Sequence, residues 1–404
     1  MVSNRRSGVV AARFKGGPDL EGLSGPASSR TWLGRSMGER VEWAFLEAGV
    51  LFIGDETPDE TLGRFLVRDD VVVTQEAIKA FADHAKNSAE DLRFELQGRL
   101  ANFVNDLAFG DTGPWLVYLV PGGAITPERI ANTKPVAIDP KEKLLEFPLS
   151  EVHHGASVIE LPIGDRLVMP TWHWLQVMWA NLLGLGPFLW RGLMGRNIVE
   201  VFFKGLFAVF RARSFRPHRV GAKLGRSGKG CRIHPSAVVE GCWLGDNVEI
   251  GANAVVRGCV IGNGALIEDL AMVEFSVLDA GARVQRQGMV KFSTLGPGSA
   301  AGGLMQLGVL DQYAALKRTG VLMDVSFGQG VSVNAGGERI AAPLAMAGCC
   351  VGKGATVGAG VQVAAGRCVP AGLTVVPGPS STLLRIPEGL DGLVMVVDGG
   401  LESR

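Results

Sequence analysis

The chain has 404 residues and carries 40 basic and 40 acidic side chains, so its formal net charge at pH 7 is zero. This length allows about two or three domains, and a neutral chain has no general field that attracts nucleic acid, so we expect no nucleic-acid partner. The start of the chain, MVSNRRSGVV, lacks the apolar stretch of a secretory signal, and we expect a cytoplasmic protein.

The first 170 residues divide into a polar start and an α/β pattern. Residues 1–35 are rich in Gly, Ser and Arg, and we predict a flexible segment there, with a short strand over residues 8–14 as the alternative. Helical patterns then cover residues 39–48, residues 75–86 and a segment that begins at Ser88. Strand-like apolar runs cover residues 65–73, 115–120, 143–147 and 158–161. This alternation predicts an α/β domain over residues 36–170.

An aromatic and basic helical linker is predicted over residues 171–227. Four of the eight tryptophans lie here, at positions 172, 174, 179 and 190. The uncharged run 175–190 is too short to span a bilayer. Two interpretations stay open. Residues 172–213 form a peripheral membrane contact through aromatic and cationic side chains, or the helix buries its apolar side on neighbouring protein.

A 17-residue repeat dominates the second half of the chain. Each unit carries three branched or small apolar positions about six residues apart. The three columns are Val239, Val256, Val273 and Val290; Leu244, Ile261, Leu278 and Leu295; and Ile250, Ile267, Val284 and Ala301. Neither a helix nor a single strand explains this spacing. It predicts a β-solenoid over residues 228–380, whose coils gain a core only by stacking, followed by a tail at 381–404.

Stacked coils lie about 4.8 Å apart, so residues 17 apart form ladders. One ladder holds small side chains, at Cys242, Cys259, Ser276 and Ser293. Another holds Gly245, Gly262, Asp279 and Gly296, and we attribute its glycines to turns that need positive φ. The six cysteines show no zinc spacing, and we expect reduced thiols.

The repeat units, opened by the sequence IHPSA at residues 233–237, resemble the hexapeptide-repeat signature. This resemblance implies a left-handed parallel β-helix, a class that is usually trimeric. We therefore expect a homotrimer formed through the β-helix.

An α/β domain followed by such a solenoid resembles the sugar-phosphate nucleotidyltransferases, especially the bifunctional N-acetylglucosamine-1-phosphate uridylyltransferase/glucosamine-1-phosphate acetyltransferases. The segments that carry the resemblance are ERVEWAFLEAGV at 39–50, RDDVVVT at 68–74, and HWL with ANLL at 173–175 and 180–183. The resemblance implies a degenerate nucleotidyltransferase-like, Rossmann-like N-terminal domain.

That family holds nucleotide phosphates in a glycine-rich loop with a basic residue. The corresponding residues here are Arg13, Lys15, Gly16 and Gly17, but the order of the motif is lost and Pro18 removes a donor. For Mg²⁺, the resemblance implies a carboxylate at Asp69 or Asp70, with Asp165 as a second candidate. We expect an altered active-site loop.

The repeats are interrupted by VSVNAGGERI at 331–340, which predicts a hairpin. In the resembling family this place carries an acetyltransferase segment, so the resemblance implies an acceptor or acetyl-CoA site at Asn334, Arg339 and Lys353. A histidine is the usual general base in such enzymes. The one histidine inside the solenoid, His234, lies in its opening phrase and is expected to cap a turn.

Three functions follow as hypotheses. The first is a sugar-phosphate nucleotidyltransferase-like protein of sugar-nucleotide or cell-envelope metabolism, with a sugar phosphate or nucleotide as its small-molecule partner. The second is a non-catalytic hexapeptide scaffold or regulatory subunit. The third is an acyl-CoA-dependent sugar acyltransferase. The sequence assigns no catalytic residue to any of them.

Overall fold

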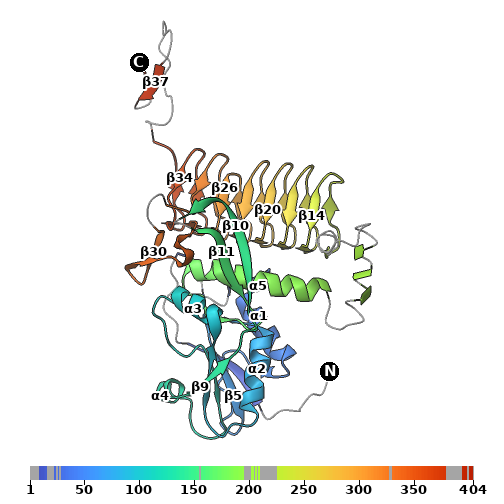
Figure 1. The fold of residues 1–404 in the computed structure, drawn as a ribbon, viewed down its shortest axis with the longest axis vertical. Helices are drawn as coiled ribbons and strands as arrows, with labels where there is room; N and C mark the ends of the chain where they lie inside the picture. Colours follow the sequence, from blue (N-terminus) through green and yellow to red (C-terminus); the bar gives the residue numbers. More distant parts are fainter. Residues whose placement is uncertain are drawn as a thin grey trace.

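The computed structural model describes residues 9–15, 22–23, 26, 29–153, 156–194, 202–203, 205–206, 208–209, 225–326, 330–378, 394–397 and 400–403. Within them, an N-terminal α/β unit and a C-terminal β-helix lie on opposite sides of one long helix, α5 (Figure 1). Gly16, Gly17 and most of residues 195–224 and 379–404 lie outside the described residues.

The N-terminal unit is built on a mixed sheet of six strands in the order β4-β1-β5-β8-β7-β9. Its strands are β1 (Val9–Phe14), β4 (Leu51–Phe52), β5 (Gly63–Arg68), β7 (Leu92–Leu96), β8 (Leu116–Leu119) and β9 (Lys134–Ile138). Strand β8 runs antiparallel to both of its neighbours, whereas the other pairs are parallel. The predicted α/β domain is confirmed, and its nucleotidyltransferase-like character stays a prediction.

Helices cover this sheet because each has an apolar face. They are α1 (Met37–Glu47), α2 (Gln75–Ala85), α3 (Gly98–Leu107) and α4 (Pro127–Ala131). Helix α1 begins at a capping box in which Ser36 and Glu39 bond each other's backbone N–H groups. Its Phe45 packs in one core cluster with Phe65 of the sheet and Phe81 of α2.

The prediction of a helix that begins at Ser88 is wrong. The Ser88 hydroxyl accepts a hydrogen bond from the Glu90 N–H at 3.0 Å, and strand β7 begins two residues later, at Leu92. A serine side chain that bonds nearby backbone favours a turn as readily as a helix start, and the sequence did not distinguish the two.

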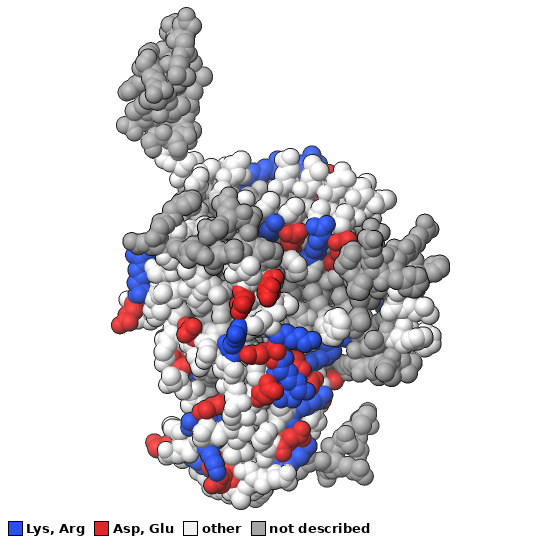
Figure 2. Space-filling view, viewed as in Figure 1, with Lys and Arg blue, Asp and Glu red and all other residues white. Residues whose placement is uncertain are grey.

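The remaining strands before α5 connect the α/β unit to the rest of the chain. They are β2 (Thr31–Trp32), β3 (Arg35–Ser36), β6 (Val71–Val73), the long hairpin β10 (Lys143–His153) and β11 (Ala156–Ile163), and β12 (Val168–Pro170). Strand β12 pairs antiparallel with β6, and the chain then enters α5 (Trp174–Met194). On the face seen in Figure 2, acidic and basic side chains are interspersed rather than separated into fields.

The β-helix has three faces of parallel strands, as the repeat predicts. The first face contains β13 (Arg232–Ile233), β16 (Glu249–Ile250), β19 (Leu266–Ile267), β22 (Arg283–Val284), β25 (Ala300–Ala301), β28 (Ala315–Leu316), β33 (Thr356–Val357) and β36 (Thr374–Val375). The second contains β14 (Val238–Glu240), β17 (Val255–Arg257), β20 (Met272–Glu274), β23 (Met289–Lys291), β26 (Leu304–Gln306), β29 (Val321–Leu322) and β34 (Gln362–Val363). The third contains β15 (Trp243–Leu244), β18 (Val260–Ile261), β21 (Val277–Leu278), β24 (Thr294–Leu295), β27 (Val309–Leu310), β32 (Cys350–Val351) and β35 (Cys368–Val369).

Inside the solenoid, the three predicted columns stack in register. Val239 pairs with Val256, Leu244 with Ile261 and Ile250 with Ile267. The chain leaves this pattern at the hairpin β30 (Ser332–Ala335) and β31 (Glu338–Ala341) and a short 3₁₀ turn, Pro343–Ala345. A final hairpin joins β37 (Val394–Val397) and β38 (Gly400–Ser403).

The reason for the glycine ladder differs from the prediction. Gly245 does not have positive φ; a Cβ there would lie 2.3 Å from Asn263 Oδ1 and 3.1 Å from the Gly262 carbonyl carbon. Close approach of stacked coils therefore excludes a side chain. Positive φ occurs two residues later, at Asn247, where it is 55°.

Helix α5 buries most of its apolar surface inside the chain. Trp174, Leu175 and Met178 are fully buried in a cluster that also contains Val260 and Val277 from the outward side of the third face. Any trimer through the β-helix, which stays a prediction, therefore uses the other two faces. No described helix is long and apolar enough to cross a membrane. Peripheral membrane contact stays a prediction, and Trp190, Phe202 and Phe203 are exposed.

The contact between α5 and the solenoid depends on Gly192. A Cβ at this position would lie 2.4 Å from Trp243 Cζ3, and the Trp243 ring is already enclosed by Phe188 and Arg226. We predict that Gly192→Ala lowers the free energy of unfolding by about 1–3 kcal/mol, because overpacking outweighs the helical preference of alanine. Urea denaturation measures the change.

Gly186→Ala is the matched control, because it lies in the same helix and its Cβ would meet no atom closer than Ile163 Cδ1 at 3.9 Å. Equal stability of the two variants would contradict the proposed packing at Trp243.

Candidate functional site

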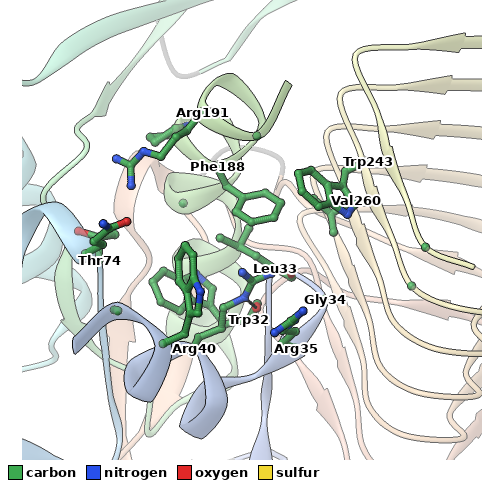
Figure 3. A pocket seen from close by; sticks show the side chains of 18 of the residues that line it. Trp32, Leu33, Gly34, Arg35, Arg40, Thr74, Phe188, Arg191, Trp243 and Val260 are labelled. Atoms are coloured by element: carbon green, nitrogen blue, oxygen red, sulfur yellow. Dashed lines mark hydrogen bonds between the residues drawn. The ribbon is translucent and has the colours of Figure 1, made fainter. Parts of the chain in front are cut away.

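A cavity of about 700 Å³ lies where α1, α5 and the first coils of the solenoid meet. We call it the junction cavity. It is lined by four arginines and four large aromatic side chains: Arg35, Arg40, Arg191, Arg226, Trp32, Trp43, Phe188 and Trp243. Figure 3 shows Arg191 and Thr74 on one side of it and Trp243 and Val260 of the solenoid on the other. This size is in the range of small-molecule sites.

Two aromatic rings lie between two cationic side chains along the cavity wall. The Arg40 guanidinium lies 4.6 Å from the Phe188 ring centroid, and the Phe188 and Trp243 centroids are 5.2 Å apart. The Arg226 guanidinium lies 4.4 Å from the Trp243 centroid. These stacked contacts hold the rings and guanidinium planes in place, so the wall is preorganised for a planar or anionic ligand.

Arg40 is fixed from the side of the α/β unit. Its Nε donates to the Trp32 carbonyl at 3.1 Å, and a second nitrogen donates to the Leu33 carbonyl. Burial lowers the pKa of Arg40 to about 10, a value at which the side chain is still positively charged at neutral pH. Arg191 is more open and lies 3.4 Å from the Glu76 carboxylate.

The junction cavity contains one carboxylate, Asp165. Its Oδ1 is buried and has no hydrogen-bond partner among the described residues, although Arg166 Nε lies 4.0 Å from it. The Thr74 hydroxyl donates to the Asp165 backbone carbonyl at 2.8 Å and holds the loop against the start of α2. Burial raises the pKa of Asp165, with Arg166 opposing the shift. Such a carboxylate is a stronger base than an exposed one.

Of the residues predicted to meet a nucleotide, Arg13 and Lys15 are described, and they lie elsewhere, at the carboxyl end of β1. The Asp69 N–H donates to the Phe14 carbonyl at 3.0 Å, so Asp69 lies near Lys15. Arg13 stacks on Phe52, with 5.3 Å from its guanidinium to the ring centroid. The structure therefore brings Arg13, Lys15 and Asp69 to one edge of the sheet.

The predicted magnesium carboxylates do not form one site. Both Asp70 oxygens accept hydrogen bonds from Arg68, at 2.5 and 2.9 Å, and Arg68 also pairs with Asp111. Asp165 lies at the opposite end of the β6–β12 ladder, since Thr171 contacts Asp70 and Thr74 contacts Asp165. Among the described residues, no group of three or more His, Cys, Asp or Glu is placed to hold a metal ion.

The predicted acceptor residues are also separated. Asn334 and Arg339 are paired across the hairpin, where Arg339 Nε donates to the Ser332 hydroxyl at 2.5 Å. Lys353 is exposed at the corner between the third and first faces, whereas the hairpin leaves the chain between the second and third faces. His234 Nδ1 accepts from the Ser236 N–H at 3.2 Å and caps its turn, as expected.

Sequence reasoning missed the junction cavity. Its lining comes from residues 32–43, 74–75, 165, 184–192 and the first solenoid coils, which lie far apart in the chain. The one available signal was the aromatic and basic composition of the segment around α5, which the sequence alone assigned to a membrane contact or a linker.

Comparisons with known proteins cover part of the solenoid. Residues 228–258 match the family described as bacterial transferase hexapeptide (six repeats). Among solved structures, the chain is similar to the acetyltransferase domain of PglB from Neisseria gonorrhoeae FA1090, with 17% sequence identity and a TM-score of 0.19. This similarity covers 28% of this chain and 55% of that chain, so the chain spans about half the length of the neisserial domain. No curated protein matches the chain.

His173 links the two halves of the molecule. It is buried at the start of α5, where its Nδ1 accepts from the Leu175 N–H at 3.1 Å and its Nε2 donates to the Asn334 carbonyl at 2.9 Å. Burial lowers the pKa of His173 to about 4. The neutral ring therefore holds the start of α5 to the hairpin that contains Asn334, and it does not act as a base.

We predict that protonation of the unfolded chain at His173 contributes a loss of stability as the pH falls from about 6.5 to about 4. Over this range the unfolded chain takes up a proton at His173, whereas the folded chain does not, so unfolding becomes favoured. The full effect is roughly 3 kcal/mol. Urea midpoints at several pH values measure it, and His173→Gln should remove this component.

His84→Gln is the control, because His84 is exposed on α2. If His173→Gln kept the same acid dependence as the natural chain, the proposed role of the buried neutral ring would be refuted.

Proposed function

We propose that the protein is an acyltransferase that binds a coenzyme A thioester in the junction cavity. One observation carries the proposal: four arginines and four aromatic side chains line a single cavity of about 700 Å³. The match of residues 228–258 to the hexapeptide transferases supports a transferase, and this segment includes Trp243 of the cavity wall.

The chemistry of the donor fits this wall. A coenzyme A thioester carries phosphate groups, an adenine ring and an acyl group bound to sulfur. Arginine pairs with phosphate through several parallel N–H donors, and its plane stacks on rings. Arg35 is exposed and Arg191 is half-buried beside Glu76, whereas Arg40 and Arg226 are held against Phe188 and Trp243. We therefore assign phosphate contact to the first pair and stacking to the second.

Asp165 is the group that we assign to proton transfer. It accepts a proton from the acceptor hydroxyl or amine while that atom attacks the thioester carbonyl. The carbon–sulfur bond then breaks, and the coenzyme A thiolate leaves and is protonated. A partly buried carboxylate whose pKa is raised holds this proton better than a fully solvated one does. A sugar is the acceptor class that we propose.

Coenzyme A binding tests the proposal. We expect acetyl-CoA to bind the natural chain, and we expect Arg35→Gln/Arg191→Gln to weaken binding about tenfold to a hundredfold, because charge-assisted hydrogen bonds to phosphate are lost. Isothermal titration calorimetry measures both affinities. Asp165→Asn should still bind the donor but should not release thiol in the presence of an acceptor.

Arg99→Gln is the control for lost charge, because Arg99 is exposed and pairs with Glu160 away from the cavity. Absence of acetyl-CoA binding to the natural chain, or equal loss in the control, would exclude the acyltransferase proposal.

A second candidate function is a nucleotidyltransferase, and one observation favours it: Arg13, Lys15 and Asp69 share one sheet edge. In this case a nucleoside triphosphate with Mg²⁺ should raise the Tm by mass action. Lys15→Gln/Asp69→Asn should abolish that shift, whereas the junction-cavity variants should keep it. A thermal-shift series with and without Mg²⁺ measures this. If neither nucleotides nor coenzyme A thioesters raised the Tm, the scaffold hypothesis would instead be favoured.

A further inference from the structure

A second cavity, of about 200 Å³, lies on the far side of strand β2 from the junction cavity. Thr31 lines the second cavity, and the next residue, Trp32, lines the first. Two adjacent residues of the solenoid are divided in the same way: Asp279 lines the second cavity, and Ala280 lines the first. The two cavities are therefore separate spaces divided by one strand.

The second cavity contains buried polar atoms that lack partners. Asp279 is 3% exposed and Thr294 is 4% exposed, and both line the space. Thr31 hydrogen-bonds the Asp279 carboxylate, but Asp279 Oδ2 and the Thr294 hydroxyl have no hydrogen-bond partner among the described residues. Leaving such groups unsatisfied is costly, and a ligand that donates hydrogen bonds to both would remove the cost.

Asp279 lines the second cavity at a position of the repeat where the coils on either side carry glycine. The positions below and above it are Gly262 and Gly296, where close coils exclude side chains. An aspartate in such a column projects out of the solenoid toward the segment that packs on it. Asp311, the next residue of this column after Gly296, does the same and pairs with Arg30 at 3.0 Å.

The charges around the cavity are unbalanced. Arg30 and Asp311 are both buried and neutralise each other, at 7% and 8% side-chain exposure. Among the described residues that line the cavity, Asp279 is the other charged side chain, and burial raises its pKa to about 7, with the hydrogen bond from Thr31 opposing the shift. A ligand with a single positive charge would balance the negative charge of Asp279.

We propose that this cavity binds the ammonium group of a small primary amine between Asp279 and Thr294. The N–H groups donate to Asp279 Oδ2 and to the Thr294 hydroxyl, and the remaining volume holds a short carbon chain. A bare metal ion fits less well, because it needs six or so oxygen ligands at short range, whereas the described lining offers two buried side-chain oxygens without a partner, Asp279 Oδ2 and the Thr294 hydroxyl. This site is independent of the acyltransferase proposal, since it uses a different cavity and different residues.

Methylammonium is the probe, and tetramethylammonium is the matched control ligand, because it carries the same charge without an N–H donor. We expect methylammonium chloride to raise the Tm of the full chain above its value in equal concentrations of tetramethylammonium or potassium chloride. Asp279→Asn should weaken methylammonium binding about tenfold to a hundredfold, and Thr294→Val should weaken it in part.

Asp246→Asn controls for the loss of one negative charge, since Asp246 is exposed on an earlier coil. Three outcomes would overturn the proposal: no difference between methylammonium and tetramethylammonium, an equal shift with potassium, or a response that persists in Asp279→Asn. If Asp279→Asn failed to fold, Thr294→Val would decide, because it removes an acceptor without changing charge.

Discussion

The outward side of the third solenoid face is apolar, and its burial holds the two halves of the chain together. Val260, Val277, Val309 and Cys350 point out of the solenoid on this face and are fully or almost fully buried, whereas Thr294 in the same column lines the second cavity. The first four pack in the same cluster as Trp174 and Met178 of α5. Because an exposed apolar strip of this length is unfavourable in water, the α/β unit cannot leave this face without exposing it.

Both cavities follow from the same packing. Two contacts hold strand β2 against the corner of the solenoid: the ion pair of Arg30, just before β2, with Asp311, and the hydrogen bond of Thr31 with Asp279. The glycines at Gly245 and Gly262 leave that corner without side chains, and so space remains beside Trp32 for the junction cavity. The ladder that allows the coils to stack thus also shapes the proposed ligand sites.

Two buried titratable groups at this junction have opposite effects on stability. His173 stays neutral and favours the folded state above about pH 6.5, where the unfolded chain is neutral as well. Asp279 acts in the opposite direction: its pKa is raised to about 7, whereas the unfolded chain loses this proton near pH 4, so stability falls as the pH rises from about 4 to about 7. A cationic ligand at Asp279 would offset the second effect and leave the first unchanged.

The solenoid could be predicted from the sequence, because the inward columns led by Val239, Leu244 and Ile250 are a local pattern that repeats with each coil. The sequence also indicated the α/β class, although the turn at Ser88 was mistaken for a helix start because the same serine chemistry serves both. Only the tertiary structure decided the sites. It bonded Asp70 to Arg68 and separated it from Asp165, and it joined Arg40, Phe188 and Trp243 into one wall. Contacts between residues that lie far apart in the chain depend on how the packed faces meet, and no periodicity along the chain records that.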